Sequence, residues 1–122
     1  MKTDLFTIKP VEGASDGSLQ YSAELNPDSV IYRAHFPQEP ITPGVCLLQM
    51  VSACVEDALG RVAVLDSARN VKFLAVVSPR EMTSLTVRLE ISGDDGEGCS
   101  VKASLTAGET VYAKMSLRYV YA

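Results

Sequence analysis

Hydrophobic and polar residues alternate along several segments of the chain, which is the pattern of half-buried β-strands. In residues 18–25 one face of such a strand would carry Leu19, Tyr21, Ala23 and Leu25. The same alternation recurs in three later segments, residues 85–91, 99–105 and 111–119. Glycine-containing turn sequences at 93–98 and 107–109 separate these three segments. We therefore expect the three to form antiparallel strands joined by hairpins.

Two further strands are expected outside these regions. A short strand is predicted around Phe6 and Ile8, before the turn sequence at 12–17. Another is predicted over residues 62–77, and it ends before Pro79 because proline cannot donate a hydrogen bond to a sheet.

One long helix is predicted between the two groups of strands, over residues 43–59. Thr42 is a favourable N-cap, Pro43 suits the first helical position, and Gly60 suits the C-terminal stop. The helix is apolar on most sides, with Val45, Leu47, Leu48, Met50, Val51, Cys54, Val55 and Leu59. Such a helix needs to be covered, and the sheet is the only element that can cover it. The expected fold is therefore α+β, an antiparallel sheet of five to six strands wrapped around one central helix.

Length and composition place this fold in a single domain. The chain has 122 residues, of which 47% are hydrophobic and 21% charged, so we expect one packed domain over residues 1–122. The net charge is −4 and no basic stripe is visible, which argues against a nucleic-acid partner. The longest apolar stretch, residues 45–55, is interrupted by Gln49 and Ser52 and is shorter than the ~20 residues of a membrane span.

The sequence also bears on location and cofactors. Residues 1–10 contain Asp4 and no apolar stretch typical of a signal peptide. Cys46 and Cys54 lie roughly 12 Å apart by helical rise alone, too far for a disulfide. We therefore expect a reduced, cytoplasmic protein. A single histidine and scattered cysteines do not make a metal site. The sequence also contains no Gly-rich phosphate-binding loop, so no cofactor is expected.

The candidate chemistry lies in residues 35–45, where His35 precedes prolines at positions 37, 40 and 43. A lone histidine is more often structural than catalytic. Here, however, prolines stiffen the loop that leads directly into a helix N-terminus. The terminus presents unpaired backbone N–H groups, and Gly44 allows a ligand to approach them closely. An imidazole beside such a terminus is suited to polarising a carbonyl and moving a neighbouring proton.

The stretch His35-Phe36-Pro37-x-x-Pro40-x-x-Pro43-Gly44-Val45 resembles the signature of the bacterial 3-hydroxyacyl-ACP dehydratases of the hot-dog fold. A second, weaker match is Val71-Lys72-Phe73 with Pro79. The resemblance implies acyl thioester substrates carried on acyl carrier protein. It also implies a homodimer or larger assembly with a continuous sheet and active sites at the subunit interface.

By this resemblance, His35 removes the proton next to the thioester carbonyl and Gly44 donates its N–H to the carbonyl oxygen. The substrate-binding residues expected around them are Phe36, Pro43, Val45 and Ser52. One position departs from the family. An acidic residue is expected fourteen positions after the histidine, where this chain has Gln49. An amide can orient water or the substrate hydroxyl but cannot give up a proton at neutral pH.

Several alternatives remain open for the missing acid. Gln49, Ser52 and Glu56 form one polar stripe of the helix, which could equally be a solvent-facing or dimer-facing edge. Glu56, Glu39 or an acidic residue from a paralogous subunit in a heterodimer could supply the proton.

Other side chains have two interpretations each. Cys46 could be a nucleophile activated by the helix dipole, or a small core residue. Three basic residues could contact an acidic carrier protein or be ordinary solvated charges: Arg33, Lys72 and Arg80.

The leading hypothesis is a dehydratase that converts a 3-hydroxyacyl thioester to a trans-2-enoyl thioester. One alternative is a non-catalytic binder of acyl carrier protein or half of a heterodimeric dehydratase, which Gln49 favours. Another is a hot-dog thioesterase. Ser52 and Glu56 would make an acyl tunnel along the helix polar, which suggests short or polar acyl chains.

Overall fold

The structure is a computed structural model that describes residues 4–12, 18–34 and 38–122, and these residues form six strands and two helices. In chain order the elements are β1 (Phe6–Val11), β2 (Leu19–Leu25), α1 (Val30–Ala34), α2 (Gly44–Leu59), β3 (Ala63–Phe73), β4 (Ser84–Ser92), β5 (Gly98–Ala107) and β6 (Thr110–Tyr121).

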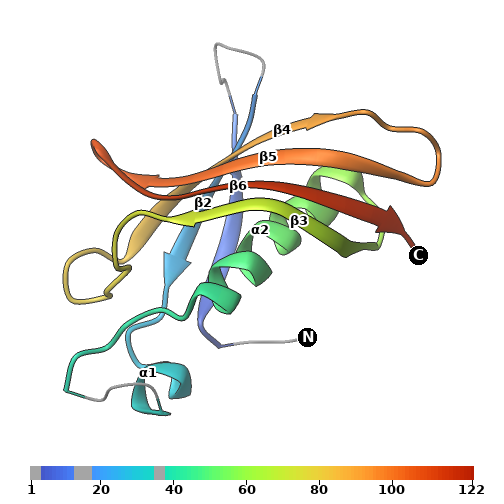
Figure 1. The fold of residues 1–122 in the computed structure, drawn as a ribbon. Helices are drawn as coiled ribbons and strands as arrows, with labels where there is room; N and C mark the ends of the chain where they lie inside the picture. Colours follow the sequence, from blue (N-terminus) through green and yellow to red (C-terminus); the bar gives the residue numbers. More distant parts are fainter. Residues whose placement is uncertain (1–3, 13–17, 35–37) are drawn as a thin grey trace.

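The strands form one sheet in the order β1-β2-β4-β5-β6-β3, and every neighbouring pair is antiparallel. The sheet curves over α2, which lies beneath the strands in Figure 1. Helix α2 packs on one face of the sheet. It contacts β3 at one edge and β1, β2 and β4 towards the other edge. The predicted architecture, an antiparallel sheet wrapped around one long helix, is confirmed.

The core forms between the inner face of the sheet and the apolar side of α2. Along β2, Tyr21, Ala23 and Leu25 are buried as the alternation predicts, while Leu19 at the end of the same face remains exposed. Met50, Val51, Cys54 and Val55 of α2 are fully buried against them. Burial raises the pKa of the Cys54 thiol to about 12, so this cysteine is a neutral core side chain.

The elements differ from the prediction mainly at one helix start, at one strand end and in one additional helix. The helix begins at Gly44 with Pro43 as its N-cap, because the Thr42 side chain bonds elsewhere and caps nothing. Strand β3 ends at Phe73 because the next two N–H groups both donate to the carbonyl of Tyr112 and turn the chain away from the sheet. Helix α1 was not predicted. Gly60 ends α2 as predicted, with φ +66° and its N–H bonded to the Glu56 carbonyl.

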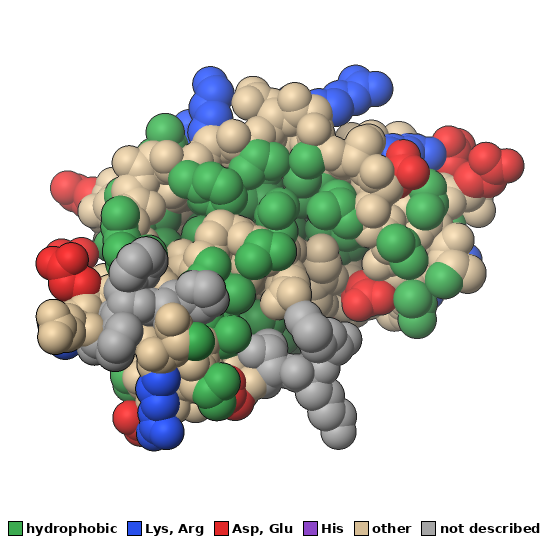
Figure 2. Space-filling view, turned by 60° about the horizontal axis from the view of Figure 1, so that its bottom comes forward, with side chains coloured by type: hydrophobic (Ala, Val, Ile, Leu, Met, Phe, Trp, Pro, Cys, Tyr) green, Lys and Arg blue, Asp and Glu red, His purple; other side chains and the backbone are tan. Residues whose placement is uncertain are grey.

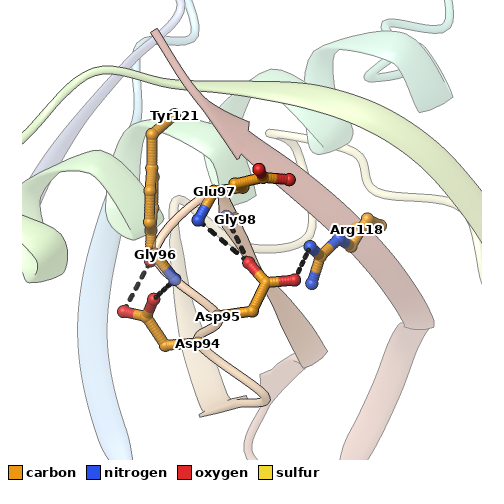
Figure 3. Close-up of polar contacts among 7 residues, drawn as sticks. All are labelled: Asp94, Asp95, Gly96, Glu97, Gly98, Arg118 and Tyr121. Carbon is orange, nitrogen blue, oxygen red and sulfur yellow. Dashed lines mark hydrogen bonds and ion pairs between the residues drawn. The ribbon is translucent and has the colours of Figure 1, made fainter.

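The turn between β4 and β5 is locked by two aspartates (Figure 3). Asp95 accepts hydrogen bonds from two backbone N–H groups of its own turn and pairs with Arg118 of β6 at 2.8 Å. Asp94 accepts from the Gly96 N–H at 3.0 Å and from the Tyr121 hydroxyl at 2.7 Å. These hydrogen bonds hold the pKa of both carboxyl groups below the usual range. The network therefore fixes the end of the sheet that lies at the C-terminal end of α2.

Candidate active site at the start of the long helix

The segment that leads into α2 is anchored at Thr42. Its N–H donates to the Val77 carbonyl at 2.8 Å, and its side-chain oxygen is 2.7 Å from the Tyr32 hydroxyl. Both side chains are buried, and Tyr32 packs with Leu5 and Cys46 in a small second core. This hydrogen bond ties α1 to the beginning of α2, so the two elements on either side of residues 35–37 in sequence are held together.

The Tyr32→Phe variant is expected to lose about 1–3 kcal/mol of unfolding free energy, because it leaves the buried Thr42 hydroxyl without its partner. Urea denaturation measures the loss. The matched control is the double variant Tyr32→Phe/Thr42→Val, which removes both polar groups and is expected to recover part of it. A Tyr32→Phe protein as stable as the wild type would show that this hydrogen bond does not anchor the helix start.

The first turn of α2 leaves backbone donors available. Pro43 has no side-chain cap, and its carbonyl accepts from both Cys46 N–H, at 3.0 Å, and Leu47 N–H, at 3.3 Å. Within the described part of the chain, the N–H groups of Gly44 and Val45 have no hydrogen-bond acceptor. A helix N-terminus also carries partial positive charge. The start of α2 is therefore suited to holding a carbonyl oxygen on which negative charge develops.

Gly44 lies directly against the ring of Phe73, at the end of β3. A Cβ placed on Gly44 would come within 2.7 Å of the far end of the Phe73 ring, so a side chain at this position would displace the ring. Phe73 remains 50% exposed. Its ring therefore forms an apolar wall beside the N–H groups of the first turn. Phe73 belongs to the weaker of the two sequence matches, Val71-Lys72-Phe73, and the fold places it at the start of α2.

The polar stripe of α2 divides into two kinds of residue. The Ser52 hydroxyl bonds to Tyr119 at 2.8 Å, and the Glu56 carboxylate accepts the Ala63 N–H at 3.0 Å, so both serve the fold. The Gln49 amide is partly buried and has no hydrogen-bond partner among the described residues. It lies one turn beyond Val45 on the same face of the helix. Among the three residues of the stripe, Gln49 is thus the one whose side-chain amide remains available to bind a ligand.

The apolar residues around Val45 in the sequence suggested that it packs into the core, but it does not. It is 61% exposed. Four apolar side chains on β3 and the segment after it are also at least half exposed: Val64, Phe73, Leu74 and Val76. Figure 2 shows a broad band of hydrophobic side chains across one face of the molecule. An exposed apolar surface of this extent is typical of an interaction site.

The structure separates the remaining candidates. Cys46 is buried and burial raises the pKa of its thiol, which favours the interpretation as a small core residue over that of an activated nucleophile. Glu39 is exposed and lines a hollow of about 350 Å³. Arg33 and Arg80 line one hollow of about 300 Å³, whereas Lys72 lines a different hollow on the sheet.

His35 and Phe36 lie outside the described residues, so their predicted roles as base and substrate contact stay predictions. Tyr32 and Thr42 lie on either side of this segment in the sequence, and the hydrogen bond between them anchors the helix start.

A six-stranded antiparallel sheet around a long helix defines the hot-dog fold, and known structures of that fold match over nearly the whole chain. The dehydratase heterocomplex ApeI:P from Xenorhabdus doucetiae is 20% identical, with 98% of this chain and 99% of that chain covered and a TM-score of 0.63. A hypothetical thioesterase from Streptococcus pneumoniae TIGR4 with coenzyme A is 14% identical, with 95% and 86% covered and a TM-score of 0.66. An uncharacterized protein from Pyrococcus horikoshii is 16% identical, with 99% and 87% covered and a TM-score of 0.71. At these identities the likeness concerns the fold.

The family model of the ApeI-like dehydratases matches residues 11–113. The chain therefore belongs to the ApeI-like dehydratase family. No curated protein sequence gives a significant match. In the part of the chain that the structure describes, no helix is long and apolar enough to cross a membrane. The same residues contain no cluster of histidine, cysteine or acidic side chains that could hold a metal ion.

Proposed function

We propose that this protein is a 3-hydroxyacyl-ACP dehydratase that eliminates water to give a trans-2-enoyl thioester. The observation that carries the proposal is the start of α2, where the N–H groups of Gly44 and Val45 have no acceptor in the described residues and the Phe73 ring lies over Gly44. Membership of the ApeI-like dehydratase family supports the same chemistry. The thioester carbonyl would rest on the Gly44 N–H, with Pro43, Val45 and Phe36 around the acyl group.

In the proposed reaction, His35 removes the proton from the carbon between the carbonyl and the hydroxyl-bearing carbon. The negative charge that develops on the carbonyl oxygen is stabilised by the helix N-terminus. The carbon–oxygen bond to the hydroxyl then breaks, and the departing group needs a proton to leave as water. Gln49 can hold the hydroxyl by hydrogen bonds but cannot supply that proton. The proton comes either from the His35 imidazolium or from an acid on another subunit.

A partner subunit fits the surface around the site. Strand β3 is an edge of the sheet, and apolar side chains at Val64 and Phe73 on it remain exposed. Pairing of this edge with a second copy would extend the sheet and cover these side chains. The alternative assembly is a heterodimer with a paralogue that carries the acid at the position of Gln49. The similar structure from Xenorhabdus doucetiae is a dehydratase heterocomplex, and this supports the heterodimer as the alternative assembly.

The proposal is tested by hydration of a short 2-enoyl-ACP with the wild type and with Gln49→Glu. We expect measurable wild-type turnover and a rate about 10²-fold higher for Gln49→Glu, because the new carboxylate can take a proton from the attacking water, the reverse of protonating the departing hydroxyl. The matched control is Glu56→Gln on the same helix face, which is expected to leave the rate unchanged because Glu56 already bonds to the backbone of β3.

The assay separates the alternatives. A silent wild type that becomes active on adding a glutamate-bearing paralogue identifies half of a heterodimer. A silent wild type with an active Gln49→Glu variant identifies a binding role for the natural chain. Release of free thiol and acid identifies a thioesterase and contradicts the dehydratase proposal, as does silence of every variant and mixture.

A further inference from the structure

Strand β3 is an edge of the sheet in the described chain, and two irregularities interrupt its pairing with β6. At each of them one residue of β3 has no partner on β6, Asp66 in the first and Arg69 in the second. An extra residue of this kind forms a β-bulge, and it changes which of the following side chains point to each face of the sheet. The two bulges enclose only Ser67 and Ala68. They therefore set the pattern of side chains at the middle of the edge.

The bulges give the inner face of β3 a symmetric spacing. Residues directly opposite each other in an antiparallel pair share a face. The inner-face residues of β3 are those that are buried or lie opposite buried side chains of β6: Ala63, Leu65, Ala68, Val71 and Phe73. On both sides of Ala68 the next inner-face residue is three positions away and the one after it a further two. A two-fold axis at Ala68 would therefore bring the inner-face residues of two identical strands opposite one another.

This register also matches apolar side chains. Leu65 of one copy would lie opposite Val71 of the second, and Ala63 would lie opposite Phe73. Ala68 would lie opposite the same residue of the second copy, and its small side chain allows a close approach on the axis. Phe73 is 50% exposed in the single chain, so the pairing would cover part of its ring. Since this ring lies at the start of α2, Ala63 of the second copy would stand beside the candidate active site.

The nearest competing register is unfavourable. A two-fold axis at Ser67 would place Leu65 opposite Arg69 and Phe73 opposite Arg61. It would thus set two apolar side chains against two cations. A shift of the axis by half a residue would place inner-face residues opposite outer-face ones.

The charges of the two bulges are complementary. Asp66 and Arg69 are both exposed, and among the described residues neither has an ion-pair partner. In the register centred on Ala68, Asp66 and Ser67 of one copy would face Asn70 and Arg69 of the second. Each Asp66 would then lie beside the Arg69 of the other copy, and the symmetry makes this contact twice. Opposite charges across neighbouring strands stabilise their pairing, so the strand is its own complement.

We propose that the bulged edge of β3 recognises the same strand of a second copy of this chain, with the two-fold axis at Ala68 and Asp66 of each copy beside Arg69 of the other. The inference rests on the edge pairing put forward with the proposed function and deepens it, because it selects the homodimer over the heterodimer. A paralogue would need both bulges and both charges at the same positions to pair equally well.

A single cysteine tests the position of the axis. Ala68→Cys would place two thiols opposite each other, at the Cα separation of about 4.5–5.5 Å that a disulfide spans. Oxidation with copper phenanthroline is expected to give a covalent dimer on a non-reducing gel. The matched control is Ser67→Cys, whose thiols would be offset by two positions, with Cα atoms about 7–8 Å apart, and should remain unlinked. The three natural cysteines are buried, and the wild type gives their background.

Charge reversal tests the identity of the partner. Asp66→Arg alone and Arg69→Asp alone would each set like charges against one another twice across the axis. We expect the dimer dissociation constant of each to rise at least about tenfold in sedimentation velocity experiments. An equal mixture of the two variants should dimerise as the wild type does, because each copy then meets the opposite charge in the other. Thermal unfolding checks that both variants fold.

The outcomes separate this inference from the proposed function, because none of these readouts needs a substrate. A covalent Ala68→Cys dimer of a protein without dehydratase turnover supports the inference and contradicts the dehydratase. Turnover by a wild type that stays monomeric keeps the dehydratase and overturns the inference. A dimer that forms only with a paralogue overturns it, as does a covalent dimer from Ser67→Cys but not from Ala68→Cys. A mixture of the charge variants that pairs no better than either alone also overturns it.

Discussion

Replacing His35 with alanine is expected to lower the rate of 2-enoyl-ACP hydration by about 10²–10⁴-fold, which is the contribution typical of a general base. In the proposed reaction His35 is the group that moves the proton next to the carbonyl, and it is the only histidine in the sequence. The described residues around the start of α2 contain no second imidazole to replace it. Steady-state kinetics with a short 2-enoyl-ACP measures the effect.

Three controls decide whether the loss is chemical. Unchanged thermal unfolding and unchanged carrier binding by His35→Ala would show that fold and docking survive. Added free imidazole is expected to restore part of the rate, because it returns the missing base. A His35→Ala variant with full activity would remove the histidine from the mechanism and with it the dehydratase proposal.

The largest effect on stability is expected from Gly98→Ala, at the start of β5. The added methyl group would overlap the carbonyl oxygen of Tyr119 on β6 and crowd the Arg118 guanidinium. The backbone of Tyr119 cannot retreat easily, because its side chain is fully buried and bonded to Ser52 of α2. We expect a loss of about 3 kcal/mol or more in unfolding free energy, measured by urea denaturation.

Gly96→Ala is the control for this variant. A Cβ at Gly96 meets no atom within 4 Å, but its φ of +84° disfavours any side chain. The expected cost is therefore only about 1–2 kcal/mol. Equal losses for the two variants would mean that backbone conformation, and not the close approach of β5 to β6, governs this turn.

The strands could be predicted from the sequence because burial on one face imposes alternation. Val87 and Leu89 of β4 alternate with Arg88, and the structure places the first two in the core and the third outside. The end of β3 could not be predicted. It depends on the Tyr112 carbonyl, which accepts two N–H groups from a segment almost forty positions earlier in the chain. Helix α1 is five residues long, too short to leave a periodic pattern.

The site was predicted in part. The loop before the helix, Gly44 and the position of Gln49 followed from the resemblance, but the polar pattern alone does not separate Gln49 from Ser52 and Glu56. Only the partners of each side chain, Tyr119 for Ser52 and Ala63 for Glu56, show which residue remains available. Thr42 was predicted to cap the helix, and no local pattern could indicate that Tyr32 would take its hydroxyl instead.

The irregular pairing of β3 bears on how the exposed edge of the sheet behaves in concentrated solution. A straight exposed edge strand with apolar neighbours is a template for indiscriminate strand addition and, at high concentration, for fibrillar aggregation. The register of β3 against β6 shifts between Leu65 and Ser67 and again between Ala68 and Asn70. Such irregularities bend the strand, so a foreign extended segment cannot pair along its whole length. Only an extended segment that follows the same bend can pair along all of β3, which limits indiscriminate strand addition at this edge.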